Sequence, residues 1–251
     1  MYVEMKNIYK KYGDFLASDN VSFGVEKGKL VALLGPSGSG KTTLLRMIAG
    51  LETPNSGDIY IDGKRVNDIP ASKRGIGFVF QNYALFRYMT IYDNVAFGLE
   101  LQKMPKNLIK ERVTKLLEMT GLSGLEKRYP NQLSGGQRQA LTLLMATMVP
   151  PDLLLLDEHT AALDPATADK VLKLTQEIIE KNNTTCLMVT HNMHQALTMG
   201  NRTLMMDDGK IVLDVEGEER ANMTVNDLLE KFHSKAGKDL DNDRILLSME
   251  K

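Results

Sequence analysis

The sequence has little cysteine, no tryptophan and no excess of charge of either sign. Its 251 residues include one cysteine, and 31 lysine and arginine residues face 32 aspartate and glutamate residues, for a net charge of −1. A single cysteine excludes a disulfide framework within the chain and fits a reducing cytosol. The charge balance argues against nucleic acid as the main partner, because nucleic-acid-binding domains are usually markedly basic.

Long apolar runs and low-complexity segments are missing as well. No stretch approaches the roughly 18 apolar residues of a membrane-spanning helix, and the first residues lack the basic-then-apolar pattern of a secretion signal. We therefore expect a soluble, cytoplasmic protein whose membrane role, if any, comes through a partner. The length suits one large α/β domain or two small ones, and no linker or internal repeat divides it.

Short β-rich runs alternate with helical runs, which predicts a mostly parallel sheet flanked by helices. Nearly continuous apolar runs are expected to form its buried strands: Leu30–Leu34, Ile76–Phe80, Leu153–Leu156, Cys186–Thr190 and Thr203–Met206. More alternating runs predict a small antiparallel β subdomain near the N-terminus: Tyr2–Lys6, Val21–Val25 and Asp58–Ile61.

Helices are predicted to follow six positions: Lys41, Lys106, Ser134, Pro165, Asn192 and Thr224. Residues 85–148 carry helical patterns without a clear core strand, so we expect an α-helical subdomain inserted into the α/β domain. Residues 217–251 are expected to contain a short helix, Val225–His233, and a polar tail. We interpret 1–251 as one domain with these two additions.

A phosphate-binding loop of the form GxxxxGK[ST] runs from Gly35 to Thr42, between an apolar strand and an apolar helix. Its backbone N–H groups are expected to cradle a β-phosphate, Lys41 to bridge β- and γ-phosphates, and the Thr42 hydroxyl to bind Mg²⁺. A glycine-rich turn without a ligand is the alternative. The fold class that follows is a P-loop NTPase. Its predicted nucleotide-binding residues in this segment are Gly35, Ser37, Gly38, Ser39, Gly40, Lys41, Thr42 and Thr43.

Two carboxylates end the apolar strand Leu153–Leu156. Ligands of open α/β sheets bind at the carboxyl ends of the strands, which is where Asp157 and Glu158 stand. Asp157 suits the shell of a Mg²⁺ ion, and Glu158 is placed to polarise an attacking water. Taken alone, the pair could equally be a helix cap, and only the phosphate loop favours the catalytic interpretation.

The pentapeptide Leu133-Ser134-Gly135-Gly136-Gln137 is the most specific motif in the chain. Ser134 and Gln137 have the spacing of a capping box, which predicts a helix that stops before Pro150. Two glycines at a helix start let another molecule approach exposed backbone N–H groups, and such a helix start binds anions. The motif therefore looks like half of a phosphate clamp whose phosphate comes from elsewhere.

These motifs together resemble the nucleotide-binding domain of an ABC transporter, and the likeness covers nearly the whole chain. Within that likeness, Gln81 matches the Q-loop glutamine, Asp164 the D-loop, His191 the switch histidine, and Tyr12 the aromatic residue that stacks on adenine. Each match is weak by itself. A glutamine after a strand is often only solvated, a histidine there often caps the next helix, and other aromatic residues lie close to Tyr12.

The resemblance implies a head-to-tail dimer, with itself or a related ATPase, that clamps two ATP molecules. The phosphate loop of one domain would then face the pentapeptide of the other, with Glu158 as general base and His191 at the γ-phosphate. Mg²⁺ would be bound by Thr42, Gln81 and Asp157. The implied partners are transmembrane permease subunits and, indirectly, a substrate-binding protein, at the inner face of the cell membrane.

The N-terminal part is very similar to the ATPase of sulfate/thiosulfate importers, on the stretches 31–35, 77–87, 94–99 and 128–130. After Gln139 the sequence resembles a different importer group. It reads Asp157-Glu158-His159 where the sulfate group has Asp-Glu-Pro, and a C-terminal regulatory domain of that group is not seen. We therefore expect a mosaic, natural or engineered, joined near Leu133–Gln139. The alternative is a divergent single-origin member.

Three function classes follow. The first is the ATPase subunit of an importer. The second is an ABC-type ATPase without a membrane partner, whose tandem domains or long coiled coil are not found in these 251 residues. The third is a mosaic module that folds and binds nucleotide with weak or uncoupled turnover.

Overall fold

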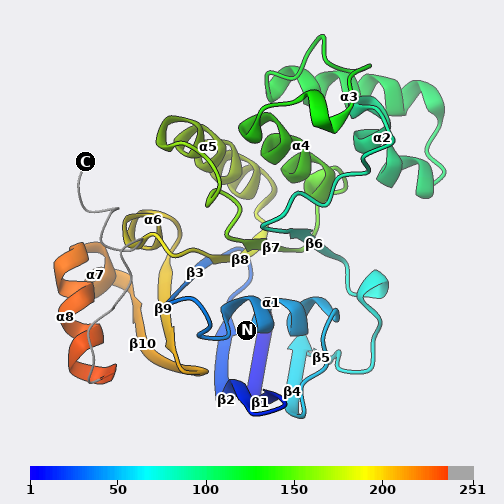
Figure 1. Ribbon diagram of the computed structural model, residues 1–251. Helices are drawn as coiled ribbons and strands as arrows, with labels where there is room; N and C mark the ends of the chain where they lie inside the picture. The colour runs from blue at the N-terminus through cyan, green and yellow to red at the C-terminus, as the bar shows by residue number, and fades with distance from the viewer. Residues whose placement is uncertain (237–251) are drawn as a thin grey trace.

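The computed structural model describes residues 1–236, so the predicted tail lies outside the described residues. Two sheets and three groups of helices build the molecule (Figure 1). One sheet has the strand order β10-β9-β3-β8-β7-β6 and the other β2-β1-β4-β5. The strands are β1 Val3–Tyr12, β2 Phe15–Val25, β3 Leu30–Leu34, β4 Ser56–Ile61, β5 Lys64–Arg65, β6 Ile76–Val79, β7 Leu153–Asp157, β8 Thr185–Val189, β9 Arg202–Asp207 and β10 Lys210–Glu216.

The larger sheet is parallel from β6 to β9, and β10 joins it antiparallel. Every residue of β3, β7 and β8 is buried, as expected for strands covered on both faces. The prediction of a mostly parallel core sheet is confirmed. The edge strand β10 was not predicted, because its half-buried residues give a weaker apolar signal than the central strands.

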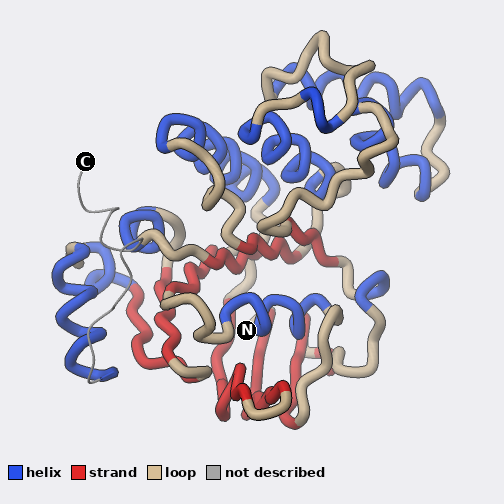
Figure 2. Tube along the Cα trace, viewed as in Figure 1, coloured by secondary structure: helices blue, strands red, loops and turns tan. Residues whose placement is uncertain are grey.

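The smaller sheet is antiparallel, as predicted, but β1 and β2 form a much longer hairpin than expected. Register shifts between Met5 and Tyr12 interrupt the alternation of buried and exposed residues. A regular period of two, the signal used for strands, is therefore lost over half of the hairpin. Helix α1 (Lys41–Ala49) lies between the two sheets, and its buried side chains join both in one core (Figure 2).

The remaining helices lie on the other side of the larger sheet from α1, and α2 and α3 are joined to it through α4 (Figure 1). They are α2 Ile91–Leu101, α3 Lys106–Met119, α4 Gly135–Thr147, α5 Pro165–Asn182, α6 Met193–Thr198, α7 Gly217–Ala221 and α8 Val225–Ala236. Helices α2, α3 and α4 share a core of their own, and α5, α6 and α8 pack against the sheet in a second core. Helix α7 was not predicted, and α8 extends beyond the predicted Val225–His233.

The parallel strands place their carboxyl ends along one edge. Because β6, β7 and β8 are neighbours in the sheet, the loops that follow them lie side by side. The loop after β3 lies next to the loop after β8 at the same edge. The sheet order therefore brings together four chain segments that are far apart in the sequence.

Candidate active site

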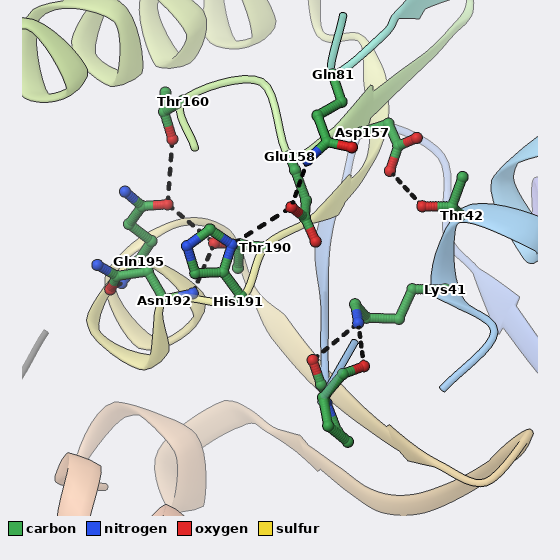
Figure 3. A network of polar contacts seen from close by, with 12 residues as sticks. Lys41, Thr42, Gln81, Asp157, Glu158, Thr160, Thr190, His191, Asn192 and Gln195 are labelled. Atoms are coloured by element: carbon green, nitrogen blue, oxygen red, sulfur yellow. Dashed lines mark hydrogen bonds and ion pairs between the residues drawn. The ribbon is translucent and has the colours of Figure 1, made fainter. Parts of the chain in front are cut away.

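The loop between β3 and α1 surrounds the ammonium group of Lys41. The buried Nζ atom donates to the backbone oxygens of Gly35 at 2.8 Å and Pro36 at 2.7 Å, and lies 3.3 Å from Ser39 Oγ (Figure 3). Burial lowers the pKa of Lys41, and the carboxylates of Glu158 and Asp157 act in the opposite direction. A partly desolvated ammonium whose hydrogen-bond partners are neutral oxygens is well prepared to bind a phosphate.

Two glycines of this loop are required by packing. Gly40 has φ +96°, and a Cβ atom there would stand 1.9 Å from the Ala17 backbone oxygen. At Gly35 a Cβ atom would stand 2.2 Å from the Met206 oxygen. The loop is thus wedged between β2 and β9, which fixes the direction of its N–H groups. Gly38 also has a positive φ, but open space surrounds it.

Thr42 and Asp157 bring two side-chain oxygen atoms together. The Thr42 hydroxyl donates to Asp157 Oδ1 at 2.8 Å, across the gap between α1 and the end of β7. Burial raises the pKa of Asp157, and the hydrogen bond from Thr42 partly offsets this effect. Mg²⁺ prefers hard oxygen ligands and in nucleotide sites is usually bound through one or two carboxylates plus phosphates. These residues fit that ion, although the described chain has no cluster of three or more acidic, histidine or cysteine ligands.

Glu158 is the centre of a contact between three loops. Gln81 Nε2, after β6, donates to Glu158 Oε2 at 3.1 Å, and His191 Nδ1, after β8, lies 3.4 Å from the same oxygen (Figure 3). The backbone N–H of Glu158 donates to the Val189 oxygen at 3.1 Å. The structure therefore brings together the three residues that were predicted to act on the γ-phosphate and on water.

Tyr12 lies at the end of β1, beside the start of α1. Its ring is 42% exposed, and Lys10 Nζ lies 4.6 Å from the ring centroid. Burial raises the pKa of Tyr12, and contact of its hydroxyl with Glu52 adds to the shift, while Thr43 acts in the opposite direction. Lys10 also donates to Glu52 at 2.7 Å.

The pentapeptide lies at the start of α4, and its predicted capping box is confirmed. Gln137 N donates to Ser134 Oγ at 3.3 Å, and Ser134 N donates to Gln137 Oε1 at 2.9 Å. The neighbours of the motif are in the next helix: a Cβ atom at Gly136 would stand 2.2 Å from Thr167 Cγ2. Asp164 caps α5 by accepting from Thr167 N at 3.0 Å. The pentapeptide and Asp164 thus adjoin each other at the starts of α4 and α5.

Sequence reasoning missed several polar residues around this site. Thr160, Thr190 and Gln195 form a second network beside His191, described below, and His159 is fully buried behind Glu158. Thr190 and Thr160 could have been suspected from their place next to the motif residues. Nothing in the sequence indicates that Gln195 meets both of them, because that depends on how α6 packs.

A parallel sheet whose first strand runs into a phosphate-binding loop, with acidic and polar residues at the next strand ends, defines a P-loop nucleotide-binding protein. The family model described as ABC transporter matches residues 18–161. The chain belongs to the ABC transporter family.

Curated relatives show which members of this family are similar to the chain. The "Sulfate/thiosulfate import ATP-binding protein CysA" of Mycobacterium bovis is 50% identical over 202 residues, which cover 80% of this chain and 58% of that protein. The protein of the same name from Rhodopseudomonas palustris is 50% identical over 215 residues, 84% of this chain and 62% of that protein. The chain thus spans about 58% of the length of the first of these curated relatives.

Solved structures show the same fold. One reports the "Dimeric structure of a post-hydrolysis state of the ATP-binding cassette MJ0796 bound to ADP and Pi", with a TM-score of 0.78 and 33% identity over 85% of this chain and 98% of that one. A second, of MJ1267, has a TM-score of 0.78 at 29% identity and covers 87% of this chain and 92% of that one. The predicted fold class is confirmed.

The comparisons do not favour the predicted mosaic. An aligned stretch of 202 residues in a chain of 251 must run across Leu133–Gln139, wherever it begins. The resemblance to sulfate/thiosulfate relatives therefore continues beyond the expected junction.

Proposed function

We propose that this chain is the ATP-binding and ATP-hydrolysing subunit of an ABC importer. The observation that carries the proposal is the contact of Gln81 and His191 with the same oxygen of Glu158, at the edge of the sheet that also holds the phosphate loop. A carboxylate that accepts from the Gln81 amide and lies beside the His191 ring, at the same sheet edge as a phosphate loop, is suited to orient a water and to take its proton.

In the proposed reaction, Glu158 accepts a proton from the water that attacks the γ-phosphorus. The bond between that phosphorus and the β–γ bridging oxygen breaks, and ADP leaves with this oxygen. Lys41 stabilises charge on the β- and γ-phosphates, and His191 and Gln81 keep the carboxylate and the water in place. Thr42, Asp157 and Gln81 would bind Mg²⁺, which supplies charge neutralisation on the phosphate oxygens. Tyr12 stacks on the adenine, and the remaining loop residues bind phosphate through their N–H groups.

We further propose that two cassettes form each site. Ser134, Gly135, Gly136, Gln137 and Asp164 would then contact the ATP held by the partner's phosphate loop. The dimeric state named for the related MJ0796 cassette supports this division. On this proposal, residues 85–148 form the helical subdomain that carries the pentapeptide to the partner.

The importer role rests on the names of the relatives, which describe sulfate/thiosulfate import. Within residues 1–236 no helix has the length and apolar character needed to cross a bilayer. We propose a peripheral position at the inner face of the membrane, with permease subunits bound at the segment Gln81–Leu99. Tyr88 in that segment is 96% exposed, as a docking residue would be. A substrate-binding protein would act only through the permease.

The mosaic with uncoupled activity is the weaker alternative. Leu34 and Val79 share one core with Leu143, Leu156 and Met188, and all five are fully buried. Segments on both sides of Leu133–Gln139 therefore pack as one body, which does not support a mismatched junction. The cargo is decided by other subunits and is not proposed beyond the class that the relatives' names give.

The test replaces the proposed base. Glu158→Gln should lower kcat by 10²–10⁴-fold, the usual contribution of a general base, while binding of Mg-ATP remains. Size-exclusion chromatography with Mg-ATP should show a trapped dimer. Glu118→Gln, on the exposed face of α3, is the matched control and should keep both turnover and the monomer–dimer behaviour of the parent. Hydrolysis by Glu158→Gln at the parental rate would reject the assignment.

A further inference from the structure

Gln195 lies on α6, four residues after His191. Its side-chain oxygen accepts two hydrogen bonds, from Thr190 Oγ1 at 2.9 Å and from Thr160 Oγ1 at 3.4 Å (Figure 3). Thr190 follows β8 and Thr160 follows β7, so one acceptor joins the two loops that carry His191 and Glu158. Both threonines are buried, where an unsatisfied hydroxyl would be costly.

On one side, the contact restrains the backbone around His191. The Thr190 hydroxyl donates to Gln195 and accepts from the Asn192 N–H at 3.0 Å. Asn192 in turn caps α6 by accepting from the Gln195 N–H at 2.9 Å. His191 is therefore enclosed in a closed ring of hydrogen bonds, in which both of its neighbours are bound through Gln195.

On the other side, the contact restrains the loop after Glu158. Two turn hydrogen bonds stiffen this loop, from Ala161 N to the Glu158 oxygen at 3.0 Å and from Leu163 N to the Thr160 oxygen at 3.2 Å. Thr160 is thus fixed relative to Glu158, and the bond to Gln195 fixes both relative to α6. A cavity of about 190 Å³ adjoins the contact, and Glu158, Thr160, His191 and Gln195 are among the residues that line it.

We propose that Gln195 is a positioning residue for hydrolysis, which holds His191 and Glu158 in register by accepting hydrogen bonds from Thr190 and Thr160. The inference rests on the proposed function of this site. Only the acceptor oxygen is needed, because both threonines donate to the same atom. Glutamate at this position keeps the acceptor, whereas leucine keeps the approximate volume and removes it.

The experiment compares Gln195→Leu with Gln195→Glu. Gln195→Leu should lower kcat by about 10- to 100-fold, the scale of effect expected when reacting groups are misplaced by up to about 1 Å, while Kd for Mg-ATP stays near the parental value. Tm should fall, because two buried hydroxyls lose their acceptor. Gln195→Glu should retain most of the parental kcat. Thr160→Val should lower kcat to a similar extent as Gln195→Leu, and Thr160→Ser should keep a kcat close to that of the parent. His194→Leu, on the exposed face of the same helix, is the control for changes to α6.

Hydrogen exchange gives a second readout that does not depend on turnover. Amides of residues 158–164 and 190–195 should exchange faster in Gln195→Leu than in the parent, and at the parental rate in Gln195→Glu. The inference is overturned if Gln195→Leu keeps the parental kcat and exchange, if Gln195→Glu is as impaired as Gln195→Leu, or if Thr160→Val is unaffected. Absence of hydrolysis in the parent would instead reject the proposed function, and the exchange rates would then decide whether Gln195 joins the loops.

Discussion

At the scale of single residues, Glu158 stands out by its backbone. Its φ of +45° lies in the left-handed region, which costs a non-glycine residue about 1–3 kcal/mol. The N–H bond to the Val189 oxygen and the turn closed by Ala161 hold this conformation. The turn directs the carboxylate toward Gln81 and His191 rather than along the sheet. The strained backbone therefore sets the position of the proposed base.

The next residue, His159, anchors the same turn from behind. It is 3% exposed, and its Nε2 lies 3.2 Å from Thr175 Oγ1. Because Thr175 donates its own proton to the Val171 oxygen at 2.8 Å, the threonine oxygen accepts and His159 carries its proton on Nε2. Burial lowers the pKa of His159 to about 4, so the ring is neutral when the protein is folded.

This burial predicts a pH-dependent loss of stability. The unfolded chain binds a proton at His159 near pH 6.5, whereas the folded chain binds it only near pH 4, so stability is complete above pH 6.5 and falls as the pH drops toward 4. Between pH 7 and pH 5 the loss should be about 2 kcal/mol. Urea unfolding at several pH values measures it. His159→Gln should remove this component and exposed His194→Gln should not, and identical pH profiles for the parent and His159→Gln would contradict the prediction.

At the scale of elements, the starts of α4 and α5 are packed against each other. Each has its own side-chain cap, Ser134 for α4 and Asp164 for α5. Gly136 in the first turn of α4 faces Thr167 in the first turn of α5. From the sequence, the lack of a side chain at position 136 was explained by the approach of another molecule. The structure adds a second explanation, which is the close packing of α5 against this position.

Gly136→Ala should therefore destabilise the fold by about 1–3 kcal/mol, the usual cost of overpacking. The added methyl group would stand 2.2 Å from Thr167 Cγ2, and the branched Thr167 side chain has little freedom to move. Thr167→Ser removes that methyl group, so the double variant should recover most of the loss in a urea double-mutant cycle. Gly135→Ala, whose Cβ would meet Leu163 Cδ2 at 3.3 Å, is the milder control. If the stability changes of the two single variants simply add in the double variant, the contact with Thr167 is not the cause of the destabilisation.

At the scale of the whole molecule, α4 joins two cores. Leu143 is buried with the larger sheet and α5, whereas Leu141 and Leu144 are buried with α2 and α3. Helix α1 similarly joins the two sheets. Because each joining helix is buried on more than one side, opening one core exposes apolar surface of the next. The described chain should therefore unfold as one cooperative unit.

A single unfolding transition, shifted upward by Mg-ATP, is the expected result. A ligand bound only by the folded state stabilises it by about 2.7 kcal/mol at a concentration of 100 Kd. Glu158→Gln should keep this shift, and Lys41→Met should lose most of it, because Lys41 lies at the centre of the phosphate loop. Differential scanning calorimetry measures both. Two separate transitions, of which Mg-ATP moves only one, would show that the cores fold independently.

Much of this could be predicted from the sequence, for identifiable reasons. The strands β3, β7 and β8 are short apolar runs, and an apolar run is a local property. The caps at Ser134 and Asp164 depend only on residues three positions away. The β1–β2 hairpin was underestimated because its bulges break the alternation, and β10 because it lies at an edge.

The sequence by itself determined the phosphate loop, the two carboxylates at the end of β7 and the family to which the chain belongs, because these are contiguous motifs whose chemistry is local. Only the tertiary structure decided that Gln81 and His191 meet on one oxygen of Glu158, that Thr167 faces Gly136, and that Gln195 joins two loops. These contacts depend on the order of strands in the sheet and on helix packing. Both are set by burial of the whole chain rather than by the spacing of any motif.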